Sequence, residues 1–466
     1  MAVNPESFVD PHLPLADLVV LDNLLGDIEA RTGSRDVSLQ KGHRGSNGTA
    51  ASVTSIEAAN GNLSKSQGGN ADANGNSSKH KNTSRAQEDK AALAELEAMN
   101  DSKSANFEPT VFVSMDLKDI NSKTANLVMQ PYIKLAQKLV RYPTDVVMAT
   151  HLLLYFTTSL PSAILLYRNF TWVHGILHTI ISFWYVGSYT LMRHQHIHQN
   201  GILARTAPIS WFDALFPYIT DPFMGHTWNS YYYHHVKHHH VEGNGPDDLS
   251  STIRYQRDSL PDFLHYIGRF YFLIWFDLPL YFLQKKKYTL AFKGSFWETT
   301  NYAFFILMAR ANLRPTLFVY IFPFLLLRLG LMIGNWGQHA FVDDEDPDSD
   351  YRSSITLIDV PSNRYCFNDG YHTSHHLNPL RHWRQHPVHF LKEKKRYADE
   401  QALVFRNIDY LMISVRLMMK DYAYLARCLV PMGKQIDMSM EEREELLKRK
   451  TRRFTEEEIR AKFGKK

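Results

Sequence analysis

Histidine is the residue whose number and spacing carry the clearest chemical signal in this chain. The 466 residues contain 23 histidines, and many of them gather in four short clusters, each at the end of an apolar stretch. The clusters read HQHIH, HHVKHHH, NWGQH and HTSHH, at residues 194–198, 234–240, 335–339 and 372–376. Because side chains four positions apart share one face of a helix, imidazole pairs from several helices can close around metal.

Nine of these histidines are candidate metal ligands. A tetrahedral zinc takes four ligands, so nine imidazoles suit two metal ions, each with a position left open for oxygen or water. Imidazole binds iron, copper, zinc or nickel, and the only two cysteines, Cys366 and Cys428, exclude a thiolate cluster and a disulfide scaffold. The candidates are His194, His198, His235, His239, His240, His339, His372, His375 and His376.

The second cluster can be read in more than one register. His235, His239 and His240 form HxxxHH, and so do His234, His238 and His239, one position earlier. The set His235, His238 and His239 forms HxxHH instead. Spacing alone leaves these alternatives open.

Polar residues near the clusters are candidates for orienting the imidazoles. A metal-bound imidazole is usually held in one tautomer by a carboxylate or carbonyl on its other ring nitrogen. Asp247, Asp248 and Asp369 fit this role, with Asn335 as a weaker candidate. The alternative is that they are ordinary turn and capping residues.

The histidine clusters need rigid elements to bring them together. The first two candidates for such elements are a pair of apolar segments. Residues 146–167 and 171–192 contain no Asp, Glu, Lys or Arg. Either segment is long enough, as a helix, to cross a hydrocarbon layer about 30 Å thick. Because the linker between them is short, we expect an antiparallel transmembrane hairpin.

A second hairpin is expected from residues 295–309 and 315–334, which are apolar although they carry Glu298 and Arg328. Residues 262–283 are also apolar but contain several ionisable side chains. Such side chains are costly at the bilayer centre, so this stretch is expected to lie in the interface or to re-enter the membrane.

The distribution of basic residues predicts the orientation of the first hairpin. Lys134, Lys138 and Arg141 precede it and Arg193 follows it, whereas its connecting loop holds only Arg168. The positive-inside rule therefore places its outer ends, and both chain termini, in the cytosol. The expected fold is an all-α integral membrane protein, with two transmembrane hairpins and interfacial helices below a cytosolic histidine-rich cap.

Composition divides the chain into three parts. Residues 1–110 are mostly a polar tail rich in Asn, Gly and Ser, expected to be disordered, with PLADLVVLDNLLGDIEA and QEDKAALAELEAM as transient helices. Residues 111–395 form the membrane domain, and residues 396–466 are expected to be basic cytosolic helices. The net charge of +4 is too mild, and the basic residues too scattered, to indicate nucleic-acid binding.

Over about residues 130–395 the motifs resemble the membrane fatty acid desaturase and hydroxylase superfamily, with its three histidine boxes. They are most similar to the alkane monooxygenase branch, where HxxxHH precedes a Pro-acid-Asp turn and HxxHH precedes NP. Here these motifs are HVKHHHVEGNGPDD and HTSHHLNP, with HQHIH as the first box and His339 as the separate histidine. The resemblance selects His235, His239 and His240 and implies that all nine histidines are ligands of a di-iron centre.

The resemblance also implies an activity. A member would use O2 and two external electrons to hydroxylate or desaturate an unactivated C–H position of a fatty acyl or alkyl chain. The electrons would come from a separate cytochrome b-type, ferredoxin or rubredoxin system, and the endoplasmic reticulum is the expected location. Two other classes compete with this interpretation: a zinc-dependent membrane hydrolase of lipid amides, and a non-enzymatic metal carrier.

Overall fold

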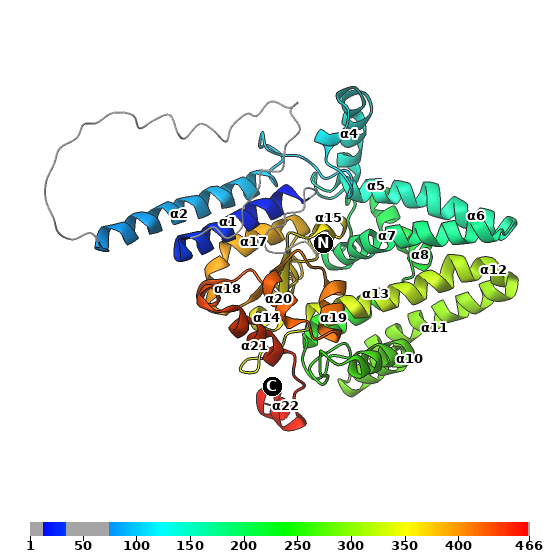
Figure 1. The fold of residues 1–466 in the computed structure, drawn as a ribbon. Helices are drawn as coiled ribbons and strands as arrows, with labels where there is room; N and C mark the ends of the chain where they lie inside the picture. Colours follow the sequence, from blue (N-terminus) through cyan, green and yellow to red (C-terminus); the bar gives the residue numbers. More distant parts are fainter. Residues whose placement is uncertain (1–12, 34–73, 465–466) are drawn as a thin grey trace.

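The protein is represented by a computed structural model that describes residues 13–33 and 74–464. Helices make up most of these residues (Figure 1). The all-α expectation needs one small correction, since strands β1 (Ile355–Ile358) and β2 (Leu403–Arg406) form a parallel two-stranded sheet. Both strands are buried at every position.

The two apolar segments of the first expected hairpin form two long helical stretches. One is formed by α5 (Val146–Leu154), η3 (Tyr155–Ser159) and α6 (Leu160–Arg168), and the other is α7 (Trp172–Gln199). The turn between them is short because Thr171 adopts an extended backbone and its hydroxyl caps the start of α7. The histidines of the first box lie at the opposite end of α7, in its last turns.

The second pair of helical stretches is formed by α11 (Tyr288–Ala311) and by α12 (Leu313–Thr316), η5 (Leu317–Ile321) and α13 (Phe322–Gln338), and the chain reverses between them at Asn312. Helix α10 (Leu260–Gln284) packs along α11. His339 directly follows α13, so the chain again delivers a histidine at the end far from the turn.

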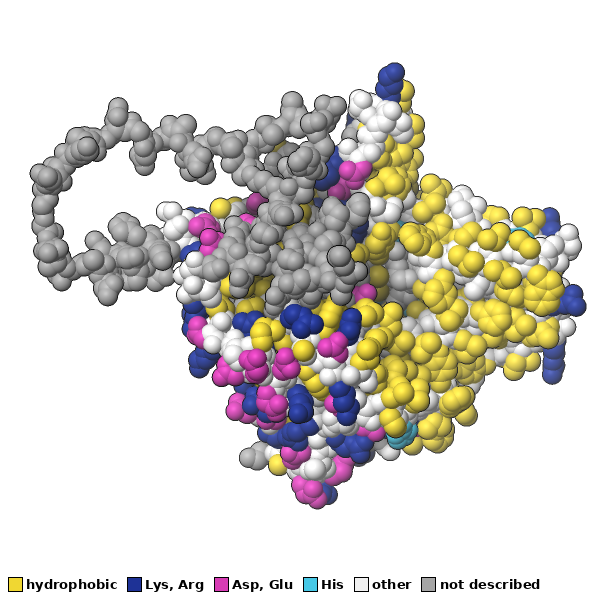
Figure 2. All heavy atoms as spheres, viewed as in Figure 1, with side chains coloured by type: hydrophobic (Ala, Val, Ile, Leu, Met, Phe, Trp, Pro, Cys, Tyr) yellow, Lys and Arg dark blue, Asp and Glu magenta, His cyan; other side chains and the backbone are white. Residues whose placement is uncertain are grey.

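The outer surface of these helices is apolar. Large side chains such as Trp184, Phe272 and Phe292 are 68%, 74% and 69% exposed. Figure 2 shows hydrophobic side chains covering this half of the molecule, whereas charged side chains gather over the other half and at the helix tips. An apolar surface this extensive marks a region that contacts lipid or another protein.

Two helices of the described chain are long and apolar enough to cross a membrane. They are the continuous stretches 146–168 and 313–338. These stretches lie in the apolar half of the molecule, and the histidine boxes lie at one end of that half.

The remaining helices are shorter, and those from residue 350 onward build, with β1 and β2, the part of the molecule called the cap, which carries the third histidine box. These remaining helices are η1 Leu117–Asp119, α3 Ser122–Thr124, η2 Ala125–Met129, α4 Gln130–Leu139, α8 Ile209–Phe223, η4 Tyr232–His239, α9 His240–Glu242, α14 Asp350–Ser353, α15 Pro361–Tyr365, α16 His372–Leu377, η6 Trp383–Gln385, α17 His386–Lys392, α18 Lys394–Asp399, α19 Tyr410–Met418, α20 Tyr422–Cys428, η7 Gly433–Asp437, α21 Met440–Lys450 and α22 Glu456–Phe463.

The cap has a core that crosses the boundary expected between residues 395 and 396. Strand β2 lies beyond that boundary and pairs with β1 before it. Phe341, Leu357, Phe405 and Leu447 belong to the same buried cluster. The C-terminal segment is therefore part of the cap rather than a separate set of helices, because its apolar side chains complete this core.

Arg257 ties the parts of the cap together. Its side chain is fully buried and donates to the carbonyl oxygens of Thr252 (3.0 Å), Ala340 (3.1 Å) and Lys450 (3.0 Å). These acceptors belong to the loop after the second box, the chain after α13 and the end of α21. One guanidinium thus satisfies buried carbonyls from three distant segments.

Two helices from the region expected to be disordered pack on the cap. In α1 (Leu15–Thr32), Leu21 and Leu24 are buried, and Leu96 of α2 (Asn74–Ala98) joins the same cluster. This differs from the expectation of transient helices, because the apolar stripe of each island finds a buried partner in the cap. The polar stretch 34–73, for which disorder was expected, lies outside the described residues.

Candidate metal centre

The second histidine box lies on a π-helix, η4. A π-helix is wound with i→i+5 hydrogen bonds, and here the His240 N–H donates to the His235 carbonyl, five residues earlier. The winding brings the His235 and His240 Nε2 atoms to 3.1 Å and leaves His239 directed elsewhere. The box is thereby divided between two groups of histidines.

The first group contains five histidines whose ring nitrogens all lie within 4.8 Å of one another. The His194 Nε2 atom is 2.8 Å from that of His235 and 3.1 Å from that of His375. The His375 Nε2 atom is 2.9 Å from that of His240. The fifth member is His198, whose ring lies against that of His194 with centroids 4.6 Å apart. All three boxes therefore contribute to one point.

The second group is built around the separate histidine. His239, His339 and His376 place their ring nitrogens within 4.8 Å of one another. His372 joins them, with its Nε2 atom 3.1 Å from that of His339 and its ring centroid 4.5 Å from that of His376. The structure thus brings all nine candidate histidines together, five in one group and four in the other.

Electrostatics keep the imidazoles of the first group neutral. Burial, followed by repulsion from neighbouring imidazoles, holds the pKa of His194, His235 and His375 well below its usual value. The same causes lower the pKa of His198 to about 3. A neutral imidazole is the form that binds metal.

The two aspartates after the second box have different surroundings. The Asp248 Oδ2 atom accepts a hydrogen bond from Nδ1 of His239 at 2.8 Å, and its carboxylate is fully buried. Burial would raise the pKa of Asp248, but His239 and His238 outweigh it and hold that pKa well below its usual value. The Asp247 carboxylate is 56% exposed and pairs with Lys285 at 2.8 Å.

The other two polar candidates lie in the walls around the histidines. Asn335 donates to the Ser250 carbonyl (2.8 Å) and the Tyr266 hydroxyl (2.7 Å), and the Ser250 hydroxyl in turn donates to Asp248 (2.8 Å). Asp369 accepts from Gln338 at 3.3 Å, and its burial raises its pKa to about 7.

His234 and His238, which the alternative registers would use, lie apart from the nine. Together with Asp248 they form a third group of potential ligands. The His238 Nε2 atom already accepts a hydrogen bond from the Leu249 N–H at 2.8 Å. A backbone partner of this kind makes His238 a structural support of the loop that carries Asp248.

One carboxylate near the second group was missed in the sequence. The Asp350 Oδ1 atom lies 3.3 Å from Nδ1 of His376, the arrangement that Asp248 makes with His239. The acidic run VDDEDPDSD at residues 342–350 is the only sequence signal, and it does not show which acid faces a histidine.

The donor set fits metal ions. A neutral imidazole has one donor and one acceptor nitrogen, so each close Nε2 contact can hold at most one proton. Five nitrogens directed at one point cannot satisfy one another in this way. The buried Nε2 atoms of His198 and His376 have no hydrogen-bond partner among the described residues. A cation in each group would resolve both conflicts.

The family model of the fatty acid desaturases matches residues 134–406, more than half of the chain. The chain belongs to the fatty acid desaturase family. The predicted superfamily is thereby confirmed, and the matched region contains all four histidine clusters. The comparisons with curated proteins and with solved structures found no match.

Family membership makes the chain an oxidoreductase of lipid metabolism, with an acyl lipid substrate and a redox partner in general terms.

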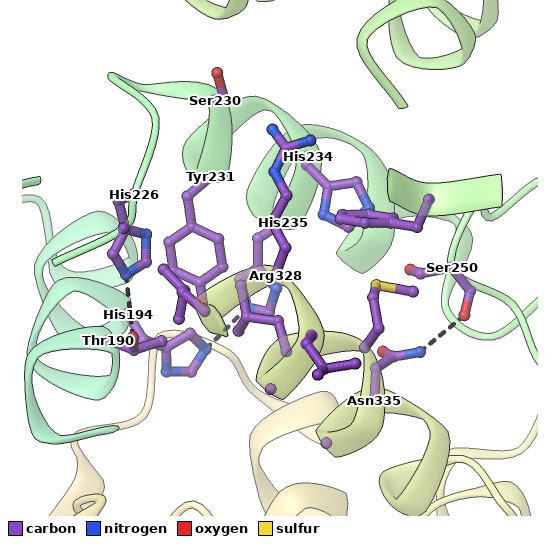
Figure 3. Close-up of a pocket in the computed structure, with 18 of the residues that line it drawn as sticks. Thr190, His194, His226, Ser230, Tyr231, His234, His235, Ser250, Arg328 and Asn335 are labelled. Carbon is purple, nitrogen blue, oxygen red and sulfur yellow. Dashed lines mark hydrogen bonds between the residues drawn. The ribbon is translucent and has the colours of Figure 1, made fainter. Parts of the chain in front are cut away.

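A cavity suited to an apolar chain reaches the histidines of this desaturase-family protein. Its volume is about 540 Å³, and α7, α10, α13 and residues 225–239 supply most of its walls, with Glu298 contributed by α11. His194, His235 and His239 line one part of it, and Figure 3 shows His194 and His235 beside Tyr231 in this wall.

Proposed function

We propose that the chain is a membrane di-iron oxidoreductase that uses O2 and external electrons to oxidise an unactivated C–H position of a fatty acyl or alkyl chain. The observation that carries the proposal is the pairing of two convergent histidine groups with a cavity that reaches both. Iron, when bound, would supply the oxygen activation that no protein side chain can perform.

The proposal assigns a role to each group of residues. His194, His198, His235, His240 and His375 would hold one iron, and His239, His339, His372 and His376 the other. The Asp248 carboxylate keeps the His239 Nδ1 atom protonated, so that its Nε2 atom faces the metal. The cavity walls orient the chain and exclude water.

Hydroxylation and desaturation remain the two outcomes within this proposal. The HxxxHH spacing and the separate His339 are features of the alkane monooxygenase branch and favour hydroxylation. Product mass separates the two, since hydroxylation adds one oxygen atom and desaturation removes two hydrogen atoms.

The membrane setting is proposed on the same grounds. The two hairpins would span the bilayer, with α4, α8 and α10 at the interface, where α8 exposes Trp211 and Leu215. The cap would face the cytosol of the endoplasmic reticulum, where a separate cytochrome b-type, ferredoxin or rubredoxin donor can reach it.

Metal analysis of the purified full-length protein tests the proposal. We expect about two irons per chain, one for each histidine group, and loss of iron in His239→Ala. His174→Ala is the matched control, because His174 lies near the hairpin turn and contacts Ser162 at 2.9 Å. One zinc per chain would favour a zinc hydrolase instead, and iron unchanged in His239→Ala would contradict the assignment of His239 as a ligand.

A further inference from the structure

The cavity wall contains an ion pair at a depth where the surrounding helices are apolar. Arg328 of α13 donates to the carboxylate of Glu298 on α11, and the two side chains are only 9% and 7% exposed. Both residues line the cavity that reaches the histidines. The Tyr302 hydroxyl also donates to Glu298, and the Arg328 guanidinium lies 4.3 Å from the ring centroid of Phe324.

An ion pair in this position needs a reason beyond stability. Removing two charges from water costs several kcal/mol per ion, and apolar side chains of similar size often stabilise a fold as well or better. Ionisable side chains inside a membrane domain usually face a cavity and serve a functional role. This pair meets both conditions, because it joins two apolar helices and borders the cavity.

The guanidinium has hydrogen-bonding capacity beyond its partner. Arginine carries five N–H donors, and one carboxylate engages at most two of them in a bidentate pair. Figure 3 shows the guanidinium of Arg328 in the cavity wall between Ser230 and His234. Donor groups of Arg328 and an acceptor carboxylate of Glu298 therefore stand side by side on the cavity surface.

We propose that the Arg328–Glu298 pair recognises a neutral polar group on the lipid substrate, one that both accepts and donates hydrogen bonds, such as a hydroxyl or an amide. The charges of Arg328 and Glu298 cancel. A substrate with a carboxylate would therefore add a net negative charge to a low-dielectric site. A hydroxyl or amide oxygen would accept from Arg328, and its O–H or N–H would donate to Glu298. The proposal rests on the function proposed above and specifies the substrate class.

The position of the pair has a consequence for the site of oxidation. Arg328 lies eleven positions before His339 along the chain, and its guanidinium lies beside His234, the neighbour of the ligand candidate His235 (Figure 3). A substrate held by its polar group at Arg328 would present to the histidines a carbon set by its distance from that group. The oxidised position is then counted from the polar group rather than from the methyl end.

Equilibrium binding tests this recognition apart from turnover. The probes are tritiated hexadecanamide, hexadecan-1-ol, palmitate and hexadecane, bound to full-length protein in lipid nanodiscs without a reductant. We expect the amide and the alcohol to bind about 10- to 100-fold tighter than hexadecane, the range of a hydrogen bond to a charged group. In the double variant R328M/E298Q, which leaves no unpaired buried charge, this preference should fall to about threefold or less.

The control is R269M/D277N, which removes another ion pair from the membrane domain. Arg269 and Asp277 lie 3.2 Å apart on α10, and neither lines the cavity that reaches the histidines. The wild-type preference should persist in this variant. Equal binding of hexadecane and the amide, tighter binding of palmitate, or an unchanged preference in R328M/E298Q would overturn the proposal. Failure of the function proposed above would show separately, as an absence of oxidised product with reductant and O2.

Discussion

Asp247 and Asp248 show how far adjacent residues of one type can differ in role. Both acids follow the second histidine box and are equal candidates in the sequence. In the fold, Asp248 is buried against Nδ1 of His239, whereas Asp247 turns outward to Lys285. The difference arises because the turn after the box directs consecutive side chains to opposite sides.

Asp248→Asn should weaken metal binding by about 10- to 100-fold, the usual effect of losing the group that orients a metal-bound histidine. The amide keeps the size of the side chain but cannot hold a negative charge against His239. Metal affinity is measured by competition with a chelator.

Asp247→Asn is the matched control, with one carboxylate removed one position away. Its metal affinity should equal that of the wild type. Equal losses in the two variants would contradict the assignment of Asp248, because they would indicate a general effect of charge near the box.

At the scale of elements, helix α1 docks on the cap through a buried polar contact. The Asp17 carboxyl is buried and accepts hydrogen bonds from the Tyr371 hydroxyl (2.6 Å) and the Asn363 amide (2.8 Å). Tyr371 directly precedes His372, so α1 supports the segment that carries the third histidine box. Nothing in the spacing of the N-terminal residues indicates this contact.

The docking of α1 should depend on pH. Burial raises the pKa of Asp17 from 3.8 to about 7, although the hydrogen bonds from Tyr371 and Asn363 oppose this shift. Because the folded value exceeds the unfolded one, the contribution of Asp17 to stability is fully present below about pH 4. This contribution is lost as the pH rises to about 7, and the free energy of unfolding then falls by roughly 4 kcal/mol at most.

Melting temperatures measured between about pH 4 and pH 7 show whether stability falls as the pH rises. The wild-type melting temperature should fall with rising pH relative to that of Asp17→Asn, whose amide does not titrate. Glu29→Gln, an exposed substitution on the same helix, should follow the wild type. Parallel curves for the wild type and Asp17→Asn would disprove the argument.

At the scale of the whole molecule, the turns of both hairpins lie at the helix ends far from the histidine groups. Arg168 ends α6 and Asn312 follows α11, whereas the cap residues pack around the opposite ends (Figure 1). If the hairpins span the bilayer, the turns and the cap must face opposite compartments.

Cysteine labelling of sealed membrane vesicles tests this arrangement. A membrane-impermeant maleimide should label Asn169→Cys and Asn312→Cys from one side of the membrane. It should label Lys395→Cys, whose side chain is 89% exposed on the cap, from the other side. Labelling of all three sites from one side would mean that the hairpins do not cross the membrane. The unsubstituted protein measures the background from Cys366 and Cys428.

The chain's own composition and spacing determined which residues are candidates for a metal centre. Nine histidines in four clusters, each at the end of an apolar stretch, predict a metal centre beside a membrane, because imidazole spacing and apolar length are local properties. The tertiary structure decided the rest. The π-helical winding of η4 assigns His235 and His240 to one group and His239 to the other. Long-range packing brings Asp350, α1 and the C-terminal segment to the cap. These contacts join residues far apart along the chain, so only the packed fold can specify them.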